Sequence, residues 1–219
     1  MDNSKYSNEP KVDYWDFIND NDLKLLLEDI LDSKNSKIIL IDGRSGSGKS
    51  YLGNKIGNLL KAPVVHTDDI AWNNHPINWD TEIKENIIKP WLNNENIEYR
   101  PKGWNETRKG AITLSRRSKL LIIEGVGAGR ISLNTNNSIL IWVQADAEKA
   151  FQRGILRDMK TEQRTKSEAV AFWNNWKMYE DPFLEEEKPW ERADIVISGD
   201  GYGANKSTSK ITRGPLLRN

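Results

Sequence analysis

The stretch IDGRSGSGKSY, residues 41–51, gathers three glycines and three serines around one lysine, directly after the apolar residues 38–41. Within it, residues 43–50 satisfy the pattern G-x-x-x-x-G-K-[ST], and the context predicts a strand before the pattern and a helix over 49–60. Glycines allow backbone angles that turn successive N–H groups inward, and the helix adds its positive N-terminal end, so the loop suits a triphosphate. The stretch therefore predicts an ATP-binding P-loop rather than a glycine-rich turn with a chance lysine.

Two residues of this loop have distinct expected roles. Lys49 would neutralise the β- and γ-phosphates and is also a catalytic candidate, while the hydroxyl of Ser50 would ligate Mg²⁺. The expected nucleotide contacts of the loop are Gly43, Arg44, Ser45, Gly46, Ser47, Gly48, Lys49, Ser50 and Tyr51. ATP and Mg²⁺ are the cofactors that this loop predicts.

Continuous apolar runs elsewhere in the chain indicate buried strands. They lie at 37–42, 63–67, 119–124, 138–143 and 193–198. Strands that are apolar throughout are typical of a parallel sheet with both faces covered. Segments of helical length and composition lie between them, at 49–60, 80–92, 146–158 and 166–180. This alternation predicts an α/β fold with helices around an open parallel sheet.

Composition argues against several classes of function. Lys+Arg and Asp+Glu both number 32, so the formal net charge of zero gives no basis for wholesale binding to nucleic acid or to an anionic membrane. The chain has no cysteine, which excludes disulfides and cysteine nucleophiles. It shows no signal pattern at its N-terminus and no apolar run near the roughly 20 residues of a membrane span. We expect a cytoplasmic protein with a small-molecule partner, either a monomer or a homo-oligomer.

Two adjacent carboxylates follow the second predicted strand, in the sequence His66-Thr67-Asp68-Asp69. Ligands of open α/β sheets gather beyond the carboxyl ends of the strands, so both aspartates are expected at the substrate. Period-two alternation places His66 and Asp68 on one side, with Asp69 starting the loop. Asp68 is the candidate to accept the proton of a substrate hydroxyl and to assist the metal, with a helix N-cap or turn as its alternative role. His66 is expected to serve packing and hydrogen bonding.

A third carboxylate, Glu124, follows four apolar residues at the end of the third predicted strand. Many P-loop proteins hold an acidic partner of Mg²⁺ at this position, so Glu124 is expected to support the metal or its waters next to the substrate. The following residues 125–130, GVGAGR, are not a dinucleotide fingerprint, because Arg130 occupies the position of the third glycine. A tight loop close to the substrate and a structural turn are equal alternatives for this segment.

Three arginines further along the chain predict contacts to phosphate. Arg153, Arg157 and Arg164 are spaced by four and seven residues, so a continuous helix would project them from one face. Guanidinium groups bind phosphate oxygens in pairs of hydrogen bonds and can stabilise charge that develops during transfer. The hypothesis is a mobile lid, about residues 153–170, with Arg153 and Arg157 on ATP, Arg157 also catalytic, and Arg164 on the substrate. The alternative is a solvated helix whose arginines pair with acidic neighbours such as Asp158.

The segment between the second and third predicted strands is about fifty residues long, more than a helical crossover needs. We therefore expect an inserted substrate-recognition element at about residues 70–118. Its candidate substrate contacts are Trp72, Tyr99 and Trp104, because an indole such as that of Trp104 could stack on a flat ligand. A hydrophobic anchor for the insert is an equal alternative for Trp104.

Together these motifs resemble the uridine kinase-like branch of the P-loop kinases, within the nucleoside kinase and phosphoribulokinase superfamily. The resemblance is carried by the P-loop, HTDDIAW at 66–72, YRPKGW at 99–104, IIEGVGAG at 122–129, RGILRD at 153–158 and ADIVISG at 193–199. It covers about residues 36–199 and implies a five-stranded parallel sheet flanked by helices. It also implies transfer of the γ-phosphate of ATP, with Mg²⁺, to a hydroxyl of a nucleoside or similar small molecule. By this resemblance Asp68 matches the catalytic acid of the family, and Glu124 matches its metal-side carboxylate.

The resemblance divides the chain into three parts. Residues 36–199 are expected to form the P-loop kinase domain. Residues 1–35 are expected to form a helical extension, because the apolar spacing over 15–32 predicts an amphipathic helix that packs on the core. Residues 200–219 are polar and aperiodic with scattered glycines, which predicts a flexible tail.

The segments that would choose the acceptor depart from uridine kinases. Residues 69–72, DIAW, stand where those enzymes carry an aromatic pair after the catalytic aspartate, and residues 102–104, KGW, replace their base-binding segment. The expected acceptor is a nucleoside similar to uridine or cytidine. The alternatives are a nucleoside monophosphate kinase, an antibiotic or sugar phosphotransferase, and an ATP-binding regulatory protein that transfers nothing. The first of these needs an arginine pocket for the acceptor phosphate, for which Arg100, Arg108 and Arg130 are available.

Overall fold

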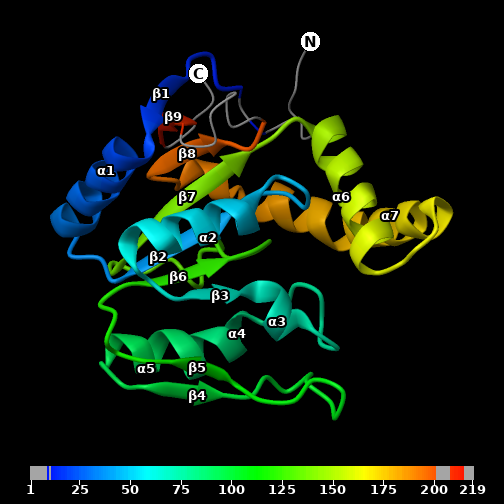
Figure 1. The fold of residues 1–219 in the computed structure, drawn as a ribbon, viewed down its shortest axis with the longest axis horizontal. Helices are drawn as coiled ribbons and strands as arrows, with labels where there is room; N and C mark the ends of the chain where they lie inside the picture. The colour runs from blue at the N-terminus through cyan, green and yellow to red at the C-terminus, as the bar shows by residue number, and fades with distance from the viewer. Residues whose placement is uncertain (1–8, 10, 201–207, 215–219) are drawn as a thin grey trace.

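A mixed α/β architecture is present in the computed structural model, which describes residue 9, residues 11–200 and residues 208–214. Its centre is a seven-stranded sheet with the strand order β1-β9-β8-β7-β2-β6-β3 (Figure 1). Five neighbouring strands run parallel, namely β8 (Ile195–Ser198), β7 (Ser138–Gln144), β2 (Ile38–Asp42), β6 (Leu121–Glu124) and β3 (Val64–His66). The five strands predicted from apolar runs are therefore confirmed, and with them the α/β class.

Two further strands extend this sheet at one edge, so the expected count of five is wrong. β9 (Thr208–Arg213) pairs antiparallel with β8, and β1 (Asp16–Asn19) pairs antiparallel with β9. Both lie at the margin of the sheet and carry mixed polar and apolar residues, so neither forms the continuous apolar run that marks a central strand.

These strands also correct the expected ends of the domain. The predicted N-terminal helix is α1 (Asp20–Ser33), but the residues before Asn19 are extended, and the side chain of Asn19 caps the helix by accepting the N–H of Asp22 at 3.0 Å. The expectation of a flexible tail is wrong for Thr208–Arg213, which forms β9. The expected tail residues 201–207 and 215–219 lie outside the described residues.

Helices cover both faces of the sheet because the buried side chains of each strand alternate between two cores. Ile39 and Ile41 of β2 pack with α1 and α2 (Lys49–Leu60) on one face. Ile38 and Leu40 face the other core, which contains Leu184 of α7 (Lys166–Glu187) and Trp190 of η2 (Pro189–Glu191). Each fully buried aliphatic side chain contributes about 1.5–3 kcal/mol, so the two cores together hold β2 in the middle of the molecule.

The chain between β3 and β6 forms a separate layer below the sheet in Figure 1. It contains α3 (Thr67–Ala71), α4 (Asp80–Ile83), the π-helical turn η1 (Lys84–Ile88), α5 (Lys89–Leu92) and the hairpin of β4 (Ile97–Tyr99) with β5 (Ile112–Leu114). After β7, α6 (Ala147–Thr161) and α7 pack against each other and project at the right of Figure 1. No helix within the described ranges combines the length and apolar character needed to cross a bilayer.

The order of the parallel strands determines where a ligand can bind. β2 lies between β6 and β7, and the chain crosses from β2 to one side first and to the other side later. The carboxyl end of β2 is therefore a switch point, where open α/β sheets bind their ligands.

Candidate active site

The glycine-rich loop leaves β2 at Asp42 and enters α2 at Lys49, as the sequence predicts. Gly46 and Gly48 have φ angles of 73° and 100°, in the left-handed region that favours glycine. A Cβ atom on Gly46 would lie 2.0 Å from the carbonyl oxygen of Ala150 in α6. Glycine at position 46 therefore allows α6 to pass directly against the loop.

Asp42 fixes the base of this loop. Its carboxylate is fully buried and accepts N–H groups from Gly43 at 2.7 Å, Gly127 at 3.1 Å and Gly129 at 2.9 Å. Burial raises the pKa of Asp42 to about 6, although Lys49 and the three backbone hydrogen bonds act in the opposite direction. A single carboxylate thus joins the P-loop to the loop that follows β6.

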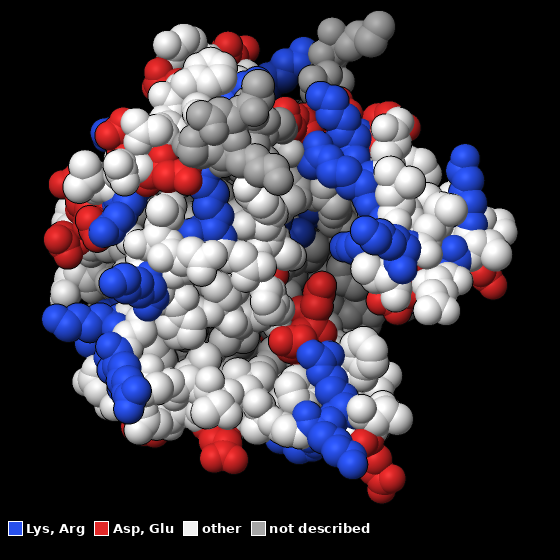
Figure 2. Space-filling model, in the orientation of Figure 1, with Lys and Arg blue, Asp and Glu red and all other residues white. Residues whose placement is uncertain are grey.

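A cavity of about 450 Å³ lies above the P-loop and brings most of the predicted site residues together. The predicted residues on its wall are Ser45, Gly46, Gly48, Lys49, Ser50, Tyr51, Asp68, Trp72, Glu124, Arg153 and Arg157. Gly125, Val126, Phe172, Trp173 and Trp176 complete much of the rest of the wall. Figure 2 shows a hollow on this face with acidic side chains at its lower side and basic side chains above it.

Asp68 and Glu124 are the two carboxylates on the cavity wall that the sequence predicts. Glu124 ends β6, as predicted, and its strand neighbour in the register is His66 of β3, whose ring nitrogen Nδ1 hydrogen-bonds Oε1 of Glu124. That hydrogen bond raises the pKa of His66, against the opposing effect of its burial. The expectation that His66 serves hydrogen bonding agrees with this contact.

Asp68 lies in the first turn of α3, and so does Asp69, which corrects the expectation that Asp69 starts a loop. Water reaches the carboxylate of Asp68 from the cavity, yet the surrounding protein displaces enough solvent to raise its pKa. Lys49 acts in the opposite direction, and the charge of Glu124 raises the pKa of Asp68 further. A carboxylate with a raised pKa is a better proton acceptor near neutral pH than a free one.

The arginines expected in a lid do not lie on one helix. α6 ends at Thr161, and Arg164 lies in the turn before α7, so the continuous helical face assumed from the spacing is wrong. Arg153 donates to the carbonyls of Gly46 at 3.3 Å and Gly199 at 2.8 Å, which attaches α6 to the P-loop. Arg157 lines the cavity and is about half exposed, with its guanidinium 2.9 Å from Asp158.

Asp158 is the buried carboxylate between the two helices of the pair. It accepts Arg157 from its own helix and lies 3.5 Å from the guanidinium of Arg164. Arg164 also stacks over the ring of Phe172 at 3.9 Å and is not among the residues on the described cavity wall. The alternative that the sequence allowed, an ion pair with Asp158, therefore accounts for the position of the Arg164 side chain.

Three of the predicted substrate contacts, Asp69, Tyr99 and Trp104, do not line the described cavity wall and instead contact other protein groups. Asp69 forms an ion pair with Arg108, and its carbonyl accepts the indole N–H of Trp104 at 2.7 Å. Arg108 stacks over the rings of Trp104 and Trp72, at 4.4 and 5.1 Å. Tyr99 donates its hydroxyl to Glu82. Within the described part of the chain none of Asp69, Tyr99 and Trp104 lines the cavity, and the anchoring role of Trp104 agrees with its contacts.

Arg44 and two other loop residues contribute to the loop without lining the cavity. The guanidinium of Arg44 is buried and forms an ion pair with Glu9, while its carbonyl accepts Nζ of Lys49 at 3.0 Å. Gly43 and Ser47 are buried in the loop. The side chain of Arg44 therefore binds protein rather than the space above the loop.

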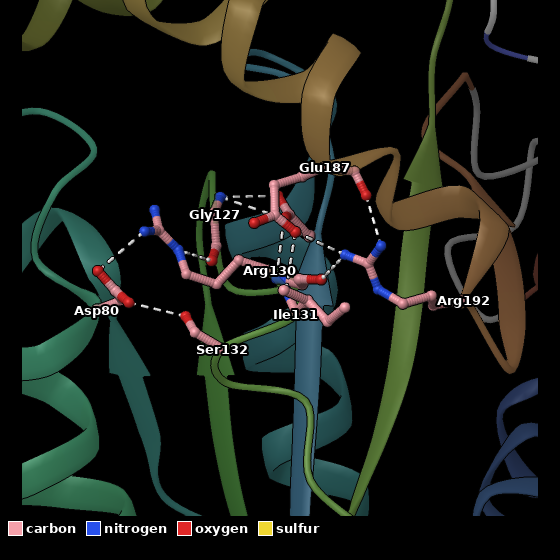
Figure 3. A network of polar contacts seen from close by, with 9 residues as sticks. Asp80, Gly127, Arg130, Ile131, Ser132, Glu187 and Arg192 are labelled. Carbon is pink, nitrogen blue, oxygen red and sulfur yellow. Dashed lines mark hydrogen bonds and ion pairs between the residues drawn. The ribbon is translucent and has the colours of Figure 1, made fainter.

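The segment after Glu124 combines both roles that the sequence allowed. Gly125 and Val126 reach the cavity, whereas Arg130 belongs to a buried polar network shown in Figure 3. Arg130 lies 3.2 Å from Asp80 and donates to the carbonyl of Gly127 at 3.1 Å. Arg192 bridges the carbonyl of Gly129 and Glu187 of α7, at 2.9 Å in each case (Figure 3).

The carboxylates of Asp68 and Glu124 and the hydroxyl of Ser50 on the wall suit Mg²⁺, which prefers oxygen ligands and is bound at kinase sites by one or two carboxylates together with substrate phosphates. Glu124 Oε2 is buried and has no hydrogen-bond partner among the described residues, which leaves an acceptor for a cation or its water. No group of three or more His, Asp or Glu residues able to hold a metal occurs in the described ranges. Ser50, Asp68 and Glu124 are the oxygen-bearing residues of the predicted set that line the cavity and could hold the ion.

Sequence reasoning missed two carboxylates that hold the P-loop. Asp42 follows a fully apolar strand, which is the local signal that could have identified it. Glu180 accepts the N–H of Ser45 at 2.6 Å, but it lies 135 residues beyond Ser45, in α7, and has no signal in its own neighbourhood. Phe172 and Trp176 also belong to α7, so their position on the cavity wall depends on how that helix packs and has no signal in the neighbouring sequence.

The parallel sheet carries the glycine-rich loop at its switch point, the carboxyl end of β2. No protein-family model matches the chain, and no curated protein matches it. Among solved structures it is similar to a possible uridine kinase from Bacillus stearothermophilus, with 20% identity, coverage of 80% of this chain and 98% of that chain, and a TM-score of 0.46.

Two other solved structures show lower similarity. An uncharacterized protein from Eubacterium ventriosum is 18% identical, with 75% of this chain and 89% of that chain covered and a TM-score of 0.41. A shikimate kinase from Bacteroides thetaiotaomicron is 16% identical, with 69% and 83% covered and a TM-score of 0.32.

Proposed function

We propose that this protein is a kinase that transfers the γ-phosphate of ATP to a hydroxyl of a nucleoside-like small molecule, with Mg²⁺ as cofactor. The observation that carries the proposal is that Asp68 and the P-loop residues Lys49 and Ser50 line the same cavity. A proton acceptor and a phosphate cradle on one wall are what phosphoryl transfer to an alcohol requires.

Each residue on the wall has a role that follows from its chemistry. Lys49 holds positive charge over the phosphate cradle, and Arg157 is placed to stabilise negative charge that develops on the transferred group. Asp68 takes the proton of the acceptor hydroxyl while the hydroxyl oxygen bonds to the γ-phosphorus and the bond to the ADP oxygen breaks. Mg²⁺ would neutralise phosphate charge here, and Ser50, Asp68 and Glu124 are the residues that would hold it.

The side chains that line the cavity favour a flat, uncharged acceptor over a phosphorylated one. Trp72, Phe172 and Trp176 supply aromatic surface there. The arginines that a nucleoside monophosphate kinase would need are engaged elsewhere. Arg100 binds the carbonyls of Gly110 and Asn105, Arg108 pairs with Asp69, and Arg130 is buried beside Asp80. These contacts support a nucleoside-like acceptor.

The test is Mg²⁺-dependent release of ADP from ATP with a panel of nucleosides, nucleoside monophosphates, sugars and aminoglycosides. Asp68→Ala should keep ATP binding and lose ~10²–10⁴-fold in turnover, because a positioned general base contributes about that much. Asp69→Asn is the matched comparison and should lose far less, since its carboxylate binds Arg108. Undiminished turnover of Asp68→Ala would remove Asp68 from the mechanism.

The panel also separates the alternatives. Stimulation by nucleosides supports the proposed acceptor, whereas stimulation only by monophosphates, sugars or aminoglycosides replaces it. ATP binding without stimulation by any acceptor would favour an ATP-binding regulatory protein.

A further inference from the structure

One peptide unit of the P-loop, between Arg44 and Ser45, is held from both sides. Its carbonyl accepts Nζ of Lys49 at 3.0 Å, and its N–H donates to Oε1 of Glu180 at 2.6 Å. The C=O and N–H of a trans peptide point in opposite directions from one rigid plane. Lys49 and Glu180 therefore act on opposite ends of the same plane.

Glu180 reaches this peptide from behind the cavity wall. Its side chain belongs to α7 and is fully buried, and among the described residues it is not part of the cavity wall, whereas Ser45 and Lys49 are. The same oxygen of Glu180 accepts the indole N–H of Trp176 at 3.2 Å, which fixes the carboxylate one turn along its own helix. The contact is thus built into the packing of α7 on the loop.

A buried carboxylate is a strong partner for a backbone N–H. Hydrogen bonds to an ionised acceptor are about twice as strong as neutral ones, and bonds at the two ends of one peptide polarise each other. The carboxylate of Glu180 therefore strengthens the negative end of the Arg44 carbonyl toward Lys49. The guanidinium of Arg44 forms an ion pair with Glu9, which anchors the side chain but leaves the orientation of the following peptide to its own hydrogen bonds.

We propose that Glu180 is a positioning residue for Lys49, which it orients through the Arg44–Ser45 peptide. The inference rests on the proposed function, because it assigns the phosphate-binding lysine a fixed direction before ATP arrives. It also makes α7 a determinant of ATP affinity, although the carboxylate of Glu180 itself touches no ligand. Rotation of the peptide after loss of Glu180 would leave the ammonium of Lys49 without its fixed acceptor.

A double-mutant cycle on ATP binding tests this inference. Glu180→Met removes the acceptor at similar length and should weaken ATP binding roughly tenfold, the value of one hydrogen bond to a charged group. In the Lys49→Met background the same substitution should have no further effect, because the residue through which it acts is gone. Glu180→Gln keeps an acceptor oxygen and should restore most of the affinity. Calorimetric titration with ATP gives each dissociation constant.

Glu186→Met is the matched control, since Glu186 is exposed on the same helix. It should leave the dissociation constant for ATP unchanged. Because a buried substitution can prevent folding, the cycle is also run with Glu180→Gln, whose smaller loss should vanish in the Lys49→Met background as well. If the Glu180 substitutions weakened ATP binding by the same factor in the wild-type and Lys49→Met backgrounds, the inference would be overturned.

A second measurement does not depend on ATP. In protein labelled with ¹⁵N-lysine, the ammonium NMR signal of Lys49 is identified as the one that disappears in Lys49→Met. The chemical shift of this signal should change in Glu180→Met and stay unchanged in Glu186→Met. An unmoved signal in Glu180→Met would also overturn the inference. Failure of the wild type to bind ATP would overturn the proposed function together with this inference, whereas additive losses or an unmoved signal would overturn this inference alone.

Discussion

Asp42 carries its charge where no solvent reaches it, and three backbone N–H groups take the place of water. Burial outweighs these bonds and the nearby Lys49, so the pKa of Asp42 rises from 3.8 to about 6. The carboxyl group therefore binds its proton more tightly in the folded chain than in the unfolded chain. A group of this kind favours folding at low pH and loses that contribution as the pH rises through its folded pKa.

Asp42→Asn should remove this pH dependence. The free energy of unfolding of the wild type, relative to that of Asp42→Asn, should fall by on the order of 3 kcal/mol between pH 4 and pH 7, since each unit of pKa shift corresponds to 1.36 kcal/mol. Urea unfolding of both proteins at a series of pH values measures the difference. If the unfolding free energies of the two proteins changed equally with pH, the raised pKa of Asp42 would be contradicted.

Single residues could be predicted from sequence where a motif fixes their surroundings. Lys49 and Ser50 follow from the loop pattern, and Glu124 follows from its position at the end of an apolar strand, so all three reach the cavity as expected. Asp69 and Trp104 could not be placed in this way. Whether they face a ligand or each other depends on how the insert folds back, and here the carbonyl of Asp69 accepts the indole of Trp104.

At the scale of elements, the pair of α6 and α7 depends on one close approach. A Cβ atom on Gly154 would lie 2.1 Å from the ring of Trp173, and that ring is buried with Ile155 and Ala169. Phe151 packs on the same ring edge to face, with 5.6 Å between ring centres. The indole therefore cannot move aside without disturbing the small core that joins the helices.

Gly154→Ala should weaken this helix pair. Alanine gains about 1 kcal/mol in helix propensity over glycine, but overpacking a well-filled core costs about 1–3 kcal/mol, and with a contact of 2.1 Å the steric cost exceeds the gain. Hydrogen exchange of α6 and α7 should become faster. Gln152→Ala is the control, because Gln152 is exposed on the same helix and alanine there meets no ring. Unchanged exchange in Gly154→Ala would show that the helices can adjust.

Elements were predictable to the extent that their apolar patterns are strong. The five parallel strands are mostly apolar, with polar residues at their ends, and the helices between them have regular spacing, so both could be predicted. The helices predicted at 146–158 and 166–180 agree closely with α6 and α7, and the capping box of Thr165 and Glu168 is a sequence signal for the start of α7. The single helical face assumed for Arg153, Arg157 and Arg164 ignored this break. Arg164 was therefore assigned to the wrong face.

On the scale of the whole molecule, β9 completes the sheet by pairing with β8 on one side and β1 on the other. The side chain of Ile211 is buried in the core below α1 and α2. Short edge strands with mixed polarity have weak local signals, and their pairing joins residues far apart in the chain. This is why sequence reasoning recovered the parallel sheet without its two antiparallel strands.

A chain that ends after Asp200 should be less stable and should associate more strongly than the full chain. Removing β9 exposes the backbone edge of the apolar strand β8 and leaves β1 without a partner, which favours association between copies. Size-exclusion chromatography and thermal unfolding measure the outcome. A chain that ends after Gly214 keeps β9 and serves as the control. A monomeric 1–200 chain with an unchanged unfolding temperature would show that β9 is dispensable.

The pairing of β1 with β9 also has a consequence during synthesis. Asp16 is opposite Ile211, so β1 has no partner strand until the residues of β9 have also been translated. Contacts so distant in sequence form slowly and leave unpaired edges exposed in the meantime. β1 therefore stays without its partner strand until β9 has emerged from the exit tunnel, and until then its backbone edge is open to other polypeptides.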